Sequence, residues 1–229
     1  MIEAIHWDMD GTIVDTEPHN DIHLPMYVRS LGVEPPEDLC ERFRGKDAKA
    51  LYGFLLAEYK LGMDINTLIK DARLSYLTYL KSLPGLATTP GVKDLIHSIA
   101  REGIPQTIAS SASRQRIHTI LEIVDLADYF PAEKIVCGDD ITNGKPFPDI
   151  YLEAAKRVGK DPKRSVGIED SNTGIASVKN AGMWCVAFSG AHNSKQDLSE
   201  AHIIVTDFSQ LSVSQLSELS VNGNLIKEC

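Results

Sequence analysis

The chain has 229 residues, enough to bury a substantial core in one large domain or in one domain that carries a smaller insert. Its formal charge of −9 at pH 7 leaves no basic stripe for a nucleic-acid backbone, so we expect no nucleic-acid partner. The 4 cysteines are far apart and form no C-x-x-C pair, which argues against a structural zinc site or a redox motif and is typical of separate thiols in a reducing compartment.

The first predicted element is a short strand, Ile5 to Asp8, after which the chain turns at Gly11. Asp8 then lies at the carboxyl end of the strand and Asp10 just beyond it, at the edge where open α/β sheets bind ligands. One carboxylate could attack phosphorus while the other hands over and retrieves a proton. A plain turn explains the same residues. A calcium loop would need Glu at its twelfth place, which here is His19.

The segment from residue 18 to residue 83 has helical spacing with almost no strand signal. Caps and stop signals predict four helices there, namely Pro18 to Leu31, Pro36 to Phe43, Asp47 to Gly62, and Asn66 to Leu83. Pro84 and Gly85 stop the last helix. These residues are therefore predicted to form a four-helix unit.

From Pro90 onward, helices alternate with short β-rich runs. The predicted strands are Pro105 to Ser110, Ile135 to Cys137, Ser165 to Ile168, Trp184 to Phe188 and Ile203 to Val205. The predicted helices are Pro90 to Glu102, Ser113 to Val124, Asp149 to Val158, Ser171 to Ala181 and Leu211 to Leu219. This alternation predicts an α/β fold with a doubly wound, mostly parallel sheet. The strand at Ile5 belongs with that sheet, so residues 18–84 are predicted to be a helical cap inserted into a core of residues 1–17 and 85–229.

Two further segments place a polar group just after a predicted strand. Thr107 to Ser113 brings small hydroxyl residues to a strand-to-helix junction, where they could cradle a phosphate, although N-capping by Ser113 explains part of the pattern. Lys145 lies in a loop that Pro146 and Pro148 stiffen. A lysine held in this way could neutralise a transferring phosphoryl group, whereas a single lysine is more often solvated surface.

A third such segment, Val166 to Gly174, contains the adjacent acids Glu169 and Asp170 between an apolar strand and a helix. Capping and the helix dipole explain acids at that place. Together with Asp8 and Asp10, however, they would make an oxygen-rich site whose negative charge is unfavourable unless a hard cation binds. Mg²⁺ fits such a site, because it is held by one or two carboxylates, waters and a substrate phosphate.

The motifs resemble those of the haloacid dehalogenase superfamily, and they follow one another in the family's order. They are D-x-D-G-T-x-x-D-T at Asp8 to Thr16, the strand-ending Ser111, G-K-P-x-P-D around Lys145, and E-D-S-x-x-G-I at Glu169 to Ile175. The helical insert is similar to the cap of the β-phosphoglucomutase and sugar-phosphate phosphatase branch. The resemblance covers nearly the whole predicted core.

The resemblance implies roles for the residues at matching positions. Asp8 would be the nucleophile and Asp10 the general acid/base. Contacts to the phosphoryl group would come from Ser111, Ala112 and Lys145. The ligands of Mg²⁺ would be the Asp8 carboxylate, the backbone carbonyl of Asp10, and Asp170, with Glu169 supporting them.

Asp10 favours phosphoryl transfer from an oxygen ester, because the family's dehalogenases and phosphonatases resemble this pattern but lack the second Asp. The predicted activity is Mg²⁺-dependent hydrolysis of a small phosphorylated metabolite, a sugar, polyol or sugar-acid phosphate, through an aspartyl phosphate. The family's mutases carry a histidine after the first motif, where this chain has Asn20 with His19 one residue early, so a β-phosphoglucomutase-type mutase is the alternative. A non-catalytic protein that binds a phosphorylated metabolite is a third possibility, since fold alone does not exclude it.

Substrate choice is predicted to lie in the cap loop from Arg42 to Lys49. A helix with a basic last turn explains these charges equally well. Our hypothesis is that Lys46 or Lys49, with Arg114 beside the second motif, recognises the distal end of a small acidic or polyhydroxylated phosphate ester.

The sequence shows no targeting or membrane signal. The N-terminal residues lack a basic region followed by an apolar stretch, and no window approaches ~18 continuous apolar residues. We expect a soluble, cytoplasmic protein without a membrane partner, acting as a monomer or a dimer.

Overall fold

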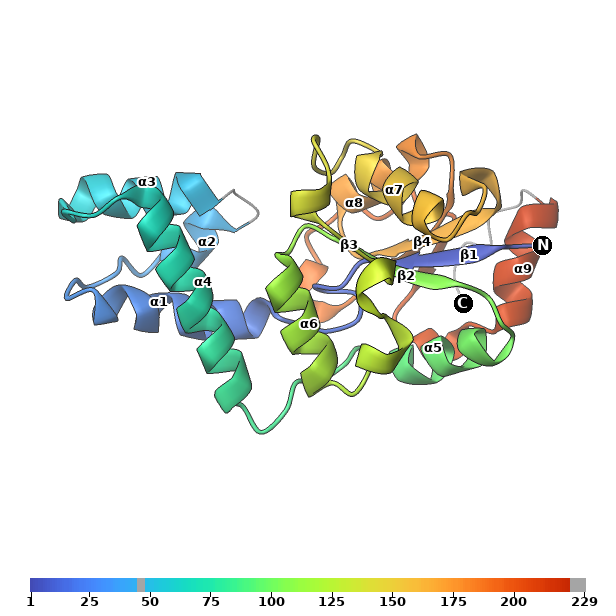
Figure 1. Ribbon diagram of the computed structural model, residues 1–229, viewed down its shortest axis with the longest axis horizontal. Helices are drawn as coiled ribbons and strands as arrows, with labels where there is room; N and C mark the ends of the chain where they lie inside the picture. The colour runs from blue at the N-terminus through green and yellow to red at the C-terminus, as the bar shows by residue number, and fades with distance from the viewer. Residues whose placement is uncertain (45–47, 223–229) are drawn as a thin grey trace. The chain divides into compact units, whose positions relative to one another are not determined.

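The computed structural model describes residues 1–44 and 48–222. The chain forms two compact units, Met1–Asp15 with Gly85–Cys229, and Thr16–Pro84. We call the first the α/β unit, because it contains the described strands, and the second the helical unit. Figure 1 follows the chain through both.

In the described part of the α/β unit, the strands form one 6-stranded sheet in which every pairing is parallel. The strands lie in the order β3 (Ile135–Cys137), β2 (Gln106–Ser110), β1 (Ala4–Trp7), β4 (Ser165–Glu169), β5 (Trp184–Phe188) and β6 (Ile203–Val205). The predicted doubly wound parallel sheet is confirmed. The order reverses at β1, which pairs with both β2 and β4, so the carboxyl end of β1 lies at the topological switch point where such sheets bind ligands.

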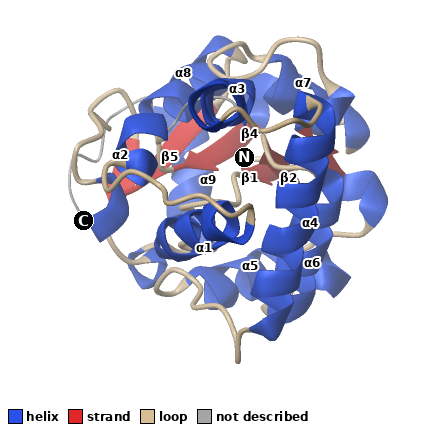
Figure 2. Cartoon of the chain, turned by 90° about the vertical axis from the view of Figure 1, so that its left-hand side faces the viewer, coloured by secondary structure: helices blue, strands red, loops and turns tan. Residues whose placement is uncertain are grey.

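Helices cover both faces of this sheet. They are α5 (Val92–Arg101), α6 (Arg114–Ile123), α7 (Asp149–Arg157), α8 (Asn172–Asn180) and α9 (Val213–Asn222). In Figures 1 and 2, α7 and α8 lie on one face, and α5, α6 and α9 lie on the other. All residues of β1, β2 and β4 are buried for this reason, so none of these three strands alternates between buried and exposed residues.

Two predicted helix starts in the α/β unit are wrong by two residues. The helix predicted from Pro90 begins at Val92, because Gly91 adopts a left-handed conformation with φ of 73°. A Cβ at Gly91 would lie 2.3 Å from the backbone N of Ser209, so this turn also needs glycine for close packing. The last helix begins at Val213 rather than Leu211.

The helical unit contains α1 (Glu17–Ser30), α2 (Leu39–Phe43), α3 (Ala48–Tyr59) and α4 (Ile65–Ser82) among its described residues. Helix α4 packs against α1 and α3, and α2 packs against α1. The helix predicted from Pro36 is shorter than expected, since Pro36 forms a turn before it with a hydrogen bond from the Leu39 N–H to its carbonyl. The predicted cap residue Asp47 lies outside the described residues. Asp64 caps α4 by accepting hydrogen bonds from the N–H groups of Asn66 and Thr67.

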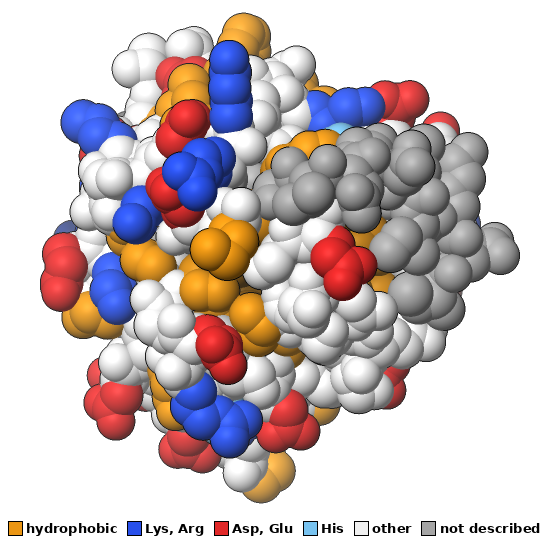
Figure 3. All heavy atoms as spheres, turned by 90° about the vertical axis from the view of Figure 1, so that its right-hand side faces the viewer, with side chains coloured by type: hydrophobic (Ala, Val, Ile, Leu, Met, Phe, Trp, Pro, Cys, Tyr) orange, Lys and Arg blue, Asp and Glu red, His pale blue; other side chains and the backbone are white. Residues whose placement is uncertain are grey.

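No helix in residues 1–44 and 48–222 is both long enough and apolar enough to span a bilayer. On the face shown in Figure 3, the coloured Lys and Arg side chains lie among Asp and Glu side chains instead of forming a continuous stripe.

Candidate functional site

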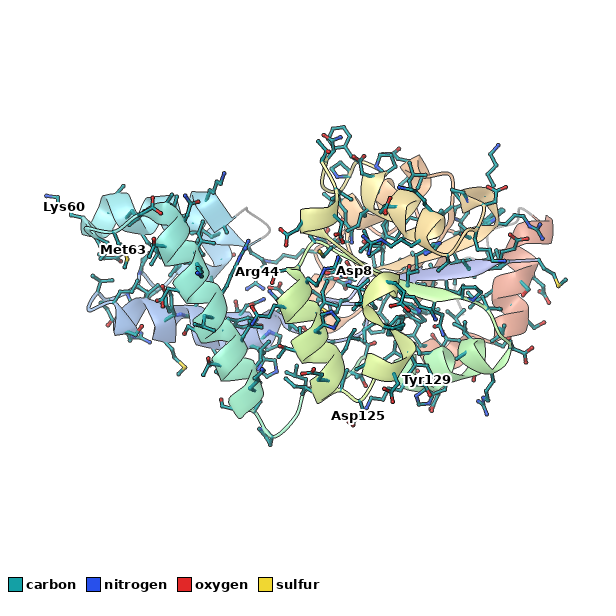
Figure 4. All side chains as sticks on the ribbon, viewed as in Figure 1. Asp8, Arg44, Lys60, Met63, Asp125 and Tyr129 are labelled. Carbon is teal, nitrogen blue, oxygen red and sulfur yellow. The ribbon has the colours of Figure 1, made fainter. Side chains whose placement is uncertain are left out.

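An acidic cluster lies at the carboxyl edge of the sheet. Asp8 directly follows β1, and its N–H continues the pairing with β4 by donating to the carbonyl of Ile168 at 2.9 Å. Glu169 ends β4 and Asp170 follows it, so the pairing of β1 with β4 brings the three acids together. One carboxylate oxygen from each of Asp8, Glu169 and Asp170 lies within 4.8 Å of the other two. Figure 4 labels Asp8 at this edge.

Lys145 comes from the loop between β3 and α7 and contacts two of these acids. Its Nζ donates to Asp8 Oδ1 at 2.5 Å and to Glu169 Oε1 at 2.6 Å, and its side chain is 9% exposed. Helix α8 holds the loop, because Ser177 Oγ donates to the carbonyl of Phe147 at 2.6 Å and Asn180 Nδ2 donates to that of Pro146 at 3.0 Å. The structure therefore places Lys145 inside the site as a held cation.

The charges of this cluster do not balance. Burial raises the pKa of the Asp8 carboxyl well above its usual range, Lys145 lowers it, and the neighbouring Glu169 and Asp170 raise it further. Burial disfavours the charged form of Lys145, but the carboxylates outweigh this effect and raise the pKa of its ammonium. Three carboxylates thus face one lysine. Oxygen donors with excess negative charge fit a divalent cation such as Mg²⁺.

Glu169 is the most deeply buried of the three acids, at 1% exposed. It accepts hydrogen bonds from Lys145, from the hydroxyl of Tyr151 at 2.8 Å and from the N–H of Asp170 at 3.1 Å. Gly174 lies directly against it, since a Cβ there would be 1.9 Å from the Glu169 carboxyl carbon. These contacts fix the Glu169 carboxylate beside Asp8 and Asp170, in a supporting position. Sequence reasoning missed Tyr151.

Sequence reasoning also missed His192 and Asn193, which support Asp170. His192 Nε2 lies 3.3 Å from Asp170 Oδ2, and its Nδ1 lies 3.3 Å from Asp15 Oδ2. Asn193 Nδ2 donates to the Asp170 carbonyl at 2.7 Å. Both residues follow β5, the neighbour of β4, so their place after a predicted strand was a signal that could have identified them. Burial raises the pKa of the Asp170 carboxyl, and its contact with His192 opposes that shift.

The structure shows why glycine stands at the fourth position of the first motif, Gly11. Its φ is 86°, and a Cβ there would lie 2.1 Å from Asp170 Oδ2 and 2.9 Å from His192 Nε2. Any side chain at this position would therefore displace Asp170. Asp10, one residue earlier, is 29% exposed and accepts a hydrogen bond through Oδ1 from Arg116 Nη2 at 2.7 Å. Arg116 was not among the predicted site residues.

Ser111 and Ala112 follow β2, the other neighbour of β1, and so lie at the same edge of the sheet. Ser111 is exposed, and Ala112 is half-buried with its N–H donating to Ser110 Oγ at 3.2 Å. Ser113 caps α6, as predicted, by accepting a hydrogen bond from the Arg116 N–H at 3.4 Å. The structure thus brings the second motif to the edge that carries the acids.

The predicted substrate residues that the structure describes, Lys49 and Arg114, are not among the residues of the acidic cluster described above. Arg114 is anchored within the α/β unit, since Nη2 donates to Asp140 at 2.5 Å and Nη1 donates to the carbonyl of Ile135 at 3.1 Å. Lys49 is exposed on α3 of the helical unit. Lys46 lies outside the described residues.

Comparison with known proteins gives four findings. Residues 5–188 match the family model described as haloacid dehalogenase-like hydrolase. The phosphorylated carbohydrates phosphatase of Thermotoga maritima is 30% identical over 185 residues, 80% of this chain and 82% of that protein. The β-phosphoglucomutase of Bacillus subtilis is 27% identical over 222 residues, 95% of each chain. Among solved structures, CbbY from Rhodobacter sphaeroides in complex with xylulose-1,5-bisphosphate has a TM-score of 0.83 and 25% identity, over 94% of this chain and 99% of that one.

Proposed function

Because the chain belongs to the haloacid dehalogenase-like hydrolase family, we propose that it is a phosphatase that hydrolyses a small phosphorylated metabolite. The substrate class is a sugar, polyol or sugar-acid phosphate, and the phosphoryl group passes through Asp8. The observation that carries the proposal is the contact of Lys145 with Asp8 and Glu169 beside Asp170, at the switch point of the sheet.

Mg²⁺ is the proposed cofactor. The Asp8 carboxylate, the Asp10 carbonyl and Asp170 would hold it, with Glu169 keeping the surrounding carboxylates in place. When bound, Mg²⁺ supplies positive charge that lets a phosphate dianion approach the Asp8 carboxylate. The negative charge that Lys145 leaves uncompensated supports this assignment.

The chain's own residues then divide the chemistry into two displacements. Asp8 attacks phosphorus, the bond from phosphorus to the ester oxygen breaks, and Asp10 gives a proton to the leaving oxygen. Asp10 next takes a proton from water, whose oxygen bonds to phosphorus as the bond to Asp8 breaks. Inorganic phosphate leaves, and Asp8 is regenerated. Lys145, Ser111 and Ala112 are the proposed contacts of the phosphoryl oxygens, so that charge is neutralised during transfer.

We propose residues 18–84 as the cap that excludes bulk water and selects the substrate. Lys46 and Lys49 are the proposed cap contacts, and Arg114 the contact from the core. Changing Lys46 or Lys49 to Ala should raise KM selectively on the best substrate. An unchanged KM would reject this assignment.

The test of the proposed function is release of inorganic phosphate across a panel of hexose, pentose, polyol and sugar-acid phosphates, with Mg²⁺ and with EDTA. We expect release with Mg²⁺, loss with EDTA and recovery on adding Mg²⁺ back. The Asp8→Asn protein should be inactive on every ester. Full activity of the Asp8→Asn protein would exclude the mechanism, and no release from any ester, a generic aryl phosphate included, would favour a non-catalytic binding protein.

A phosphosugar mutase is the second candidate, supported by the similarity of the chain to a β-phosphoglucomutase over 95% of its length. His19, near the position of the mutase histidine, lies on α1 with its Nδ1 3.3 Å from the hydroxyl of Tyr79. A mutase would interconvert two sugar phosphates in a reaction that depends on a bisphosphate activator. Phosphate release without such isomerisation would exclude it.

A further inference from the structure

Arg116 lies outside every motif described above, yet its guanidinium contacts the proposed acid/base residue. Arg116 Nη2 donates to Asp10 Oδ1 at 2.7 Å, between positions 106 residues apart in the sequence. The two side chains are 23% and 29% exposed. The ion pair is therefore partly shielded from water and lies beside the acidic cluster, so it can affect the site.

Helix α6 holds Arg116 in place. Ser113 caps the helix and accepts the hydrogen bond of the Arg116 N–H, so Arg116 stands in the first turn, where the helix meets the edge of the sheet. Ile117, Ile120 and Leu121 on the same helix are fully buried. The guanidinium is thus presented from a packed element, whereas Asp10 belongs to the turn after β1.

The two aspartates with proposed catalytic roles, Asp8 and Asp10, therefore contact different cations. Lys145, from the loop after β3, contacts Asp8, while Arg116, from the helix after β2, contacts Asp10. The contact with Lys145 holds the carboxylate of Asp8, the proposed nucleophile, in its place. By the same geometry, the contact with Arg116 restricts rotation of the Asp10 carboxylate about its side-chain torsions.

We propose that Arg116 is a positioning residue for Asp10, holding its carboxylate where it exchanges a proton with the leaving oxygen and then with water. This inference rests on the phosphatase function proposed above. Proton transfer requires the Asp10 carboxylate oxygen to lie within hydrogen-bond reach of the oxygen that gains or loses the proton. A misplacement of the carboxylate by about 1 Å can lower the rate about a hundredfold. Arg116 itself touches neither substrate nor phosphoryl group in this role.

Measuring the two half-reactions, phosphorylation of Asp8 and hydrolysis of the aspartyl phosphate, distinguishes a positioning role of Arg116 from a purely structural one. An aryl phosphate releases a stable phenolate, so its first displacement needs no proton from Asp10, whereas hydrolysis of the aspartyl phosphate still needs Asp10 to activate water. With p-nitrophenyl phosphate, Arg116→Ala should give a rapid burst of about one p-nitrophenolate per enzyme. A steady rate lowered by about tenfold to a hundredfold should follow the burst.

An alkyl phosphate should respond differently, since its leaving oxygen needs the proton. On the best alkyl substrate, we expect Arg116→Ala to lower kcat at least as much as on the aryl ester, with no phosphorylated enzyme accumulating. Arg116→Lys should recover part of the rate, because it keeps the charge. Arg101→Ala removes an exposed arginine of α5 that contacts Ser98, and should leave both rates unchanged.

A double variant tests whether Arg116 acts through Asp10. In an Asp10→Asn background, adding Arg116→Ala should change the steady rate on p-nitrophenyl phosphate by less than about twofold, since Arg116 acts through Asp10. An active wild type with unchanged rates in Arg116→Ala would overturn the role of Arg116 and leave the phosphatase function standing. A tenfold further loss in the Asp10→Asn background would do the same. A wild type that releases phosphate from no ester would overturn both.

Discussion

Replacing Lys145 by methionine should destabilise the α/β unit, because it removes the cation from between two buried carboxylates. Lys145 Nζ lies 2.5 Å from Asp8 Oδ1 and 2.6 Å from Glu169 Oε1. The three side chains are only 9%, 9% and 1% exposed, so water cannot replace the ammonium fully. Methionine keeps an unbranched, apolar side chain but removes the ammonium group, with its charge and its hydrogen bonds to Asp8 and Glu169.

The size of the loss follows from these contacts. Removing one partner of a buried ion pair costs about 3–5 kcal/mol, because the other charge is left uncompensated. Two carboxylates are left here, but the Tyr151 hydroxyl and the Asp170 N–H still donate to Glu169 and limit the cost. We expect the free energy of unfolding to fall by about 3–5 kcal/mol. For a unit of this size, that lowers Tm by roughly 6–20 °C.

Tryptophan fluorescence reports this unit selectively, since both tryptophans of the chain, Trp7 and Trp184, belong to it. Urea unfolding is followed with EDTA present, so that no metal contributes. Lys156→Met is the matched control. Lys156 Nζ also contacts a carboxylate, that of Glu153 at 2.9 Å, but its side chain is 77% exposed, and its removal should cost at most about 1 kcal/mol.

The reasoning would be refuted if Lys145→Met lost no more stability than Lys156→Met. Saturating Mg²⁺ should also stabilise Lys145→Met, because it binds the native carboxylates that the lysine leaves behind. No gain from Mg²⁺ in either the wild type or the variant would contradict the proposed metal site.

Three further changes test other parts of the α/β unit. Gly174→Ala should lower the free energy of unfolding by about 1–3 kcal/mol, because its Cβ would displace the Glu169 carboxylate, whereas Gly85→Ala, with nothing within 4 Å, should not. His192→Ala should weaken Mg²⁺ binding by about 10–100-fold in calorimetry, because His192 orients Asp170, and an unchanged affinity would argue against that support. Burial lowers the pKa of His6 from 6.5 to about 3, so His6 stays neutral in the folded protein. The unfolded chain binds a proton at His6 below pH 6.5, so the stability present above that pH is lost as pH falls towards 3. Urea unfolding with EDTA should show a loss of about 2 kcal/mol between pH 7.5 and pH 5 that His6→Gln lacks.

The sequence predicted the sheet well, because buried parallel strands are short apolar runs between turn and cap signals. The strands Ile135–Cys137, Trp184–Phe188 and Ile203–Val205 have the predicted bounds. Helix starts were less predictable. Pro90 was expected to open a helix, but the packing of Gly91 against Ser209 starts it two residues later, and that contact joins segments distant in sequence.

The predicted site was only partly complete. Asp8, Lys145 and the two acids Glu169 and Asp170 lie together because each ends or follows a strand of one sheet, and the motifs point to that shared edge. Arg116 could not be singled out in the same way, whereas His192 follows the predicted strand Trp184 to Phe188 and could have been considered on that ground. The contact of Arg116 with Asp10 depends on which side of α6 faces the turn after β1. The contact of His192 with Asp170 depends on the path of the loop after β5. No residue spacing encodes either contact.

Whether Asp8 receives the phosphoryl group is tested most directly by trapping the aspartyl phosphate during turnover. Borohydride reduces an acyl phosphate to an alcohol, which converts the modified aspartate to homoserine, and mass spectrometry of the digested protein locates it. We expect homoserine at position 8, formed only when Mg²⁺ and a phosphate ester are present. Homoserine at position 10 instead, or none while phosphate is released at an unchanged rate by the Asp8→Asn protein, would contradict the role given to Asp8.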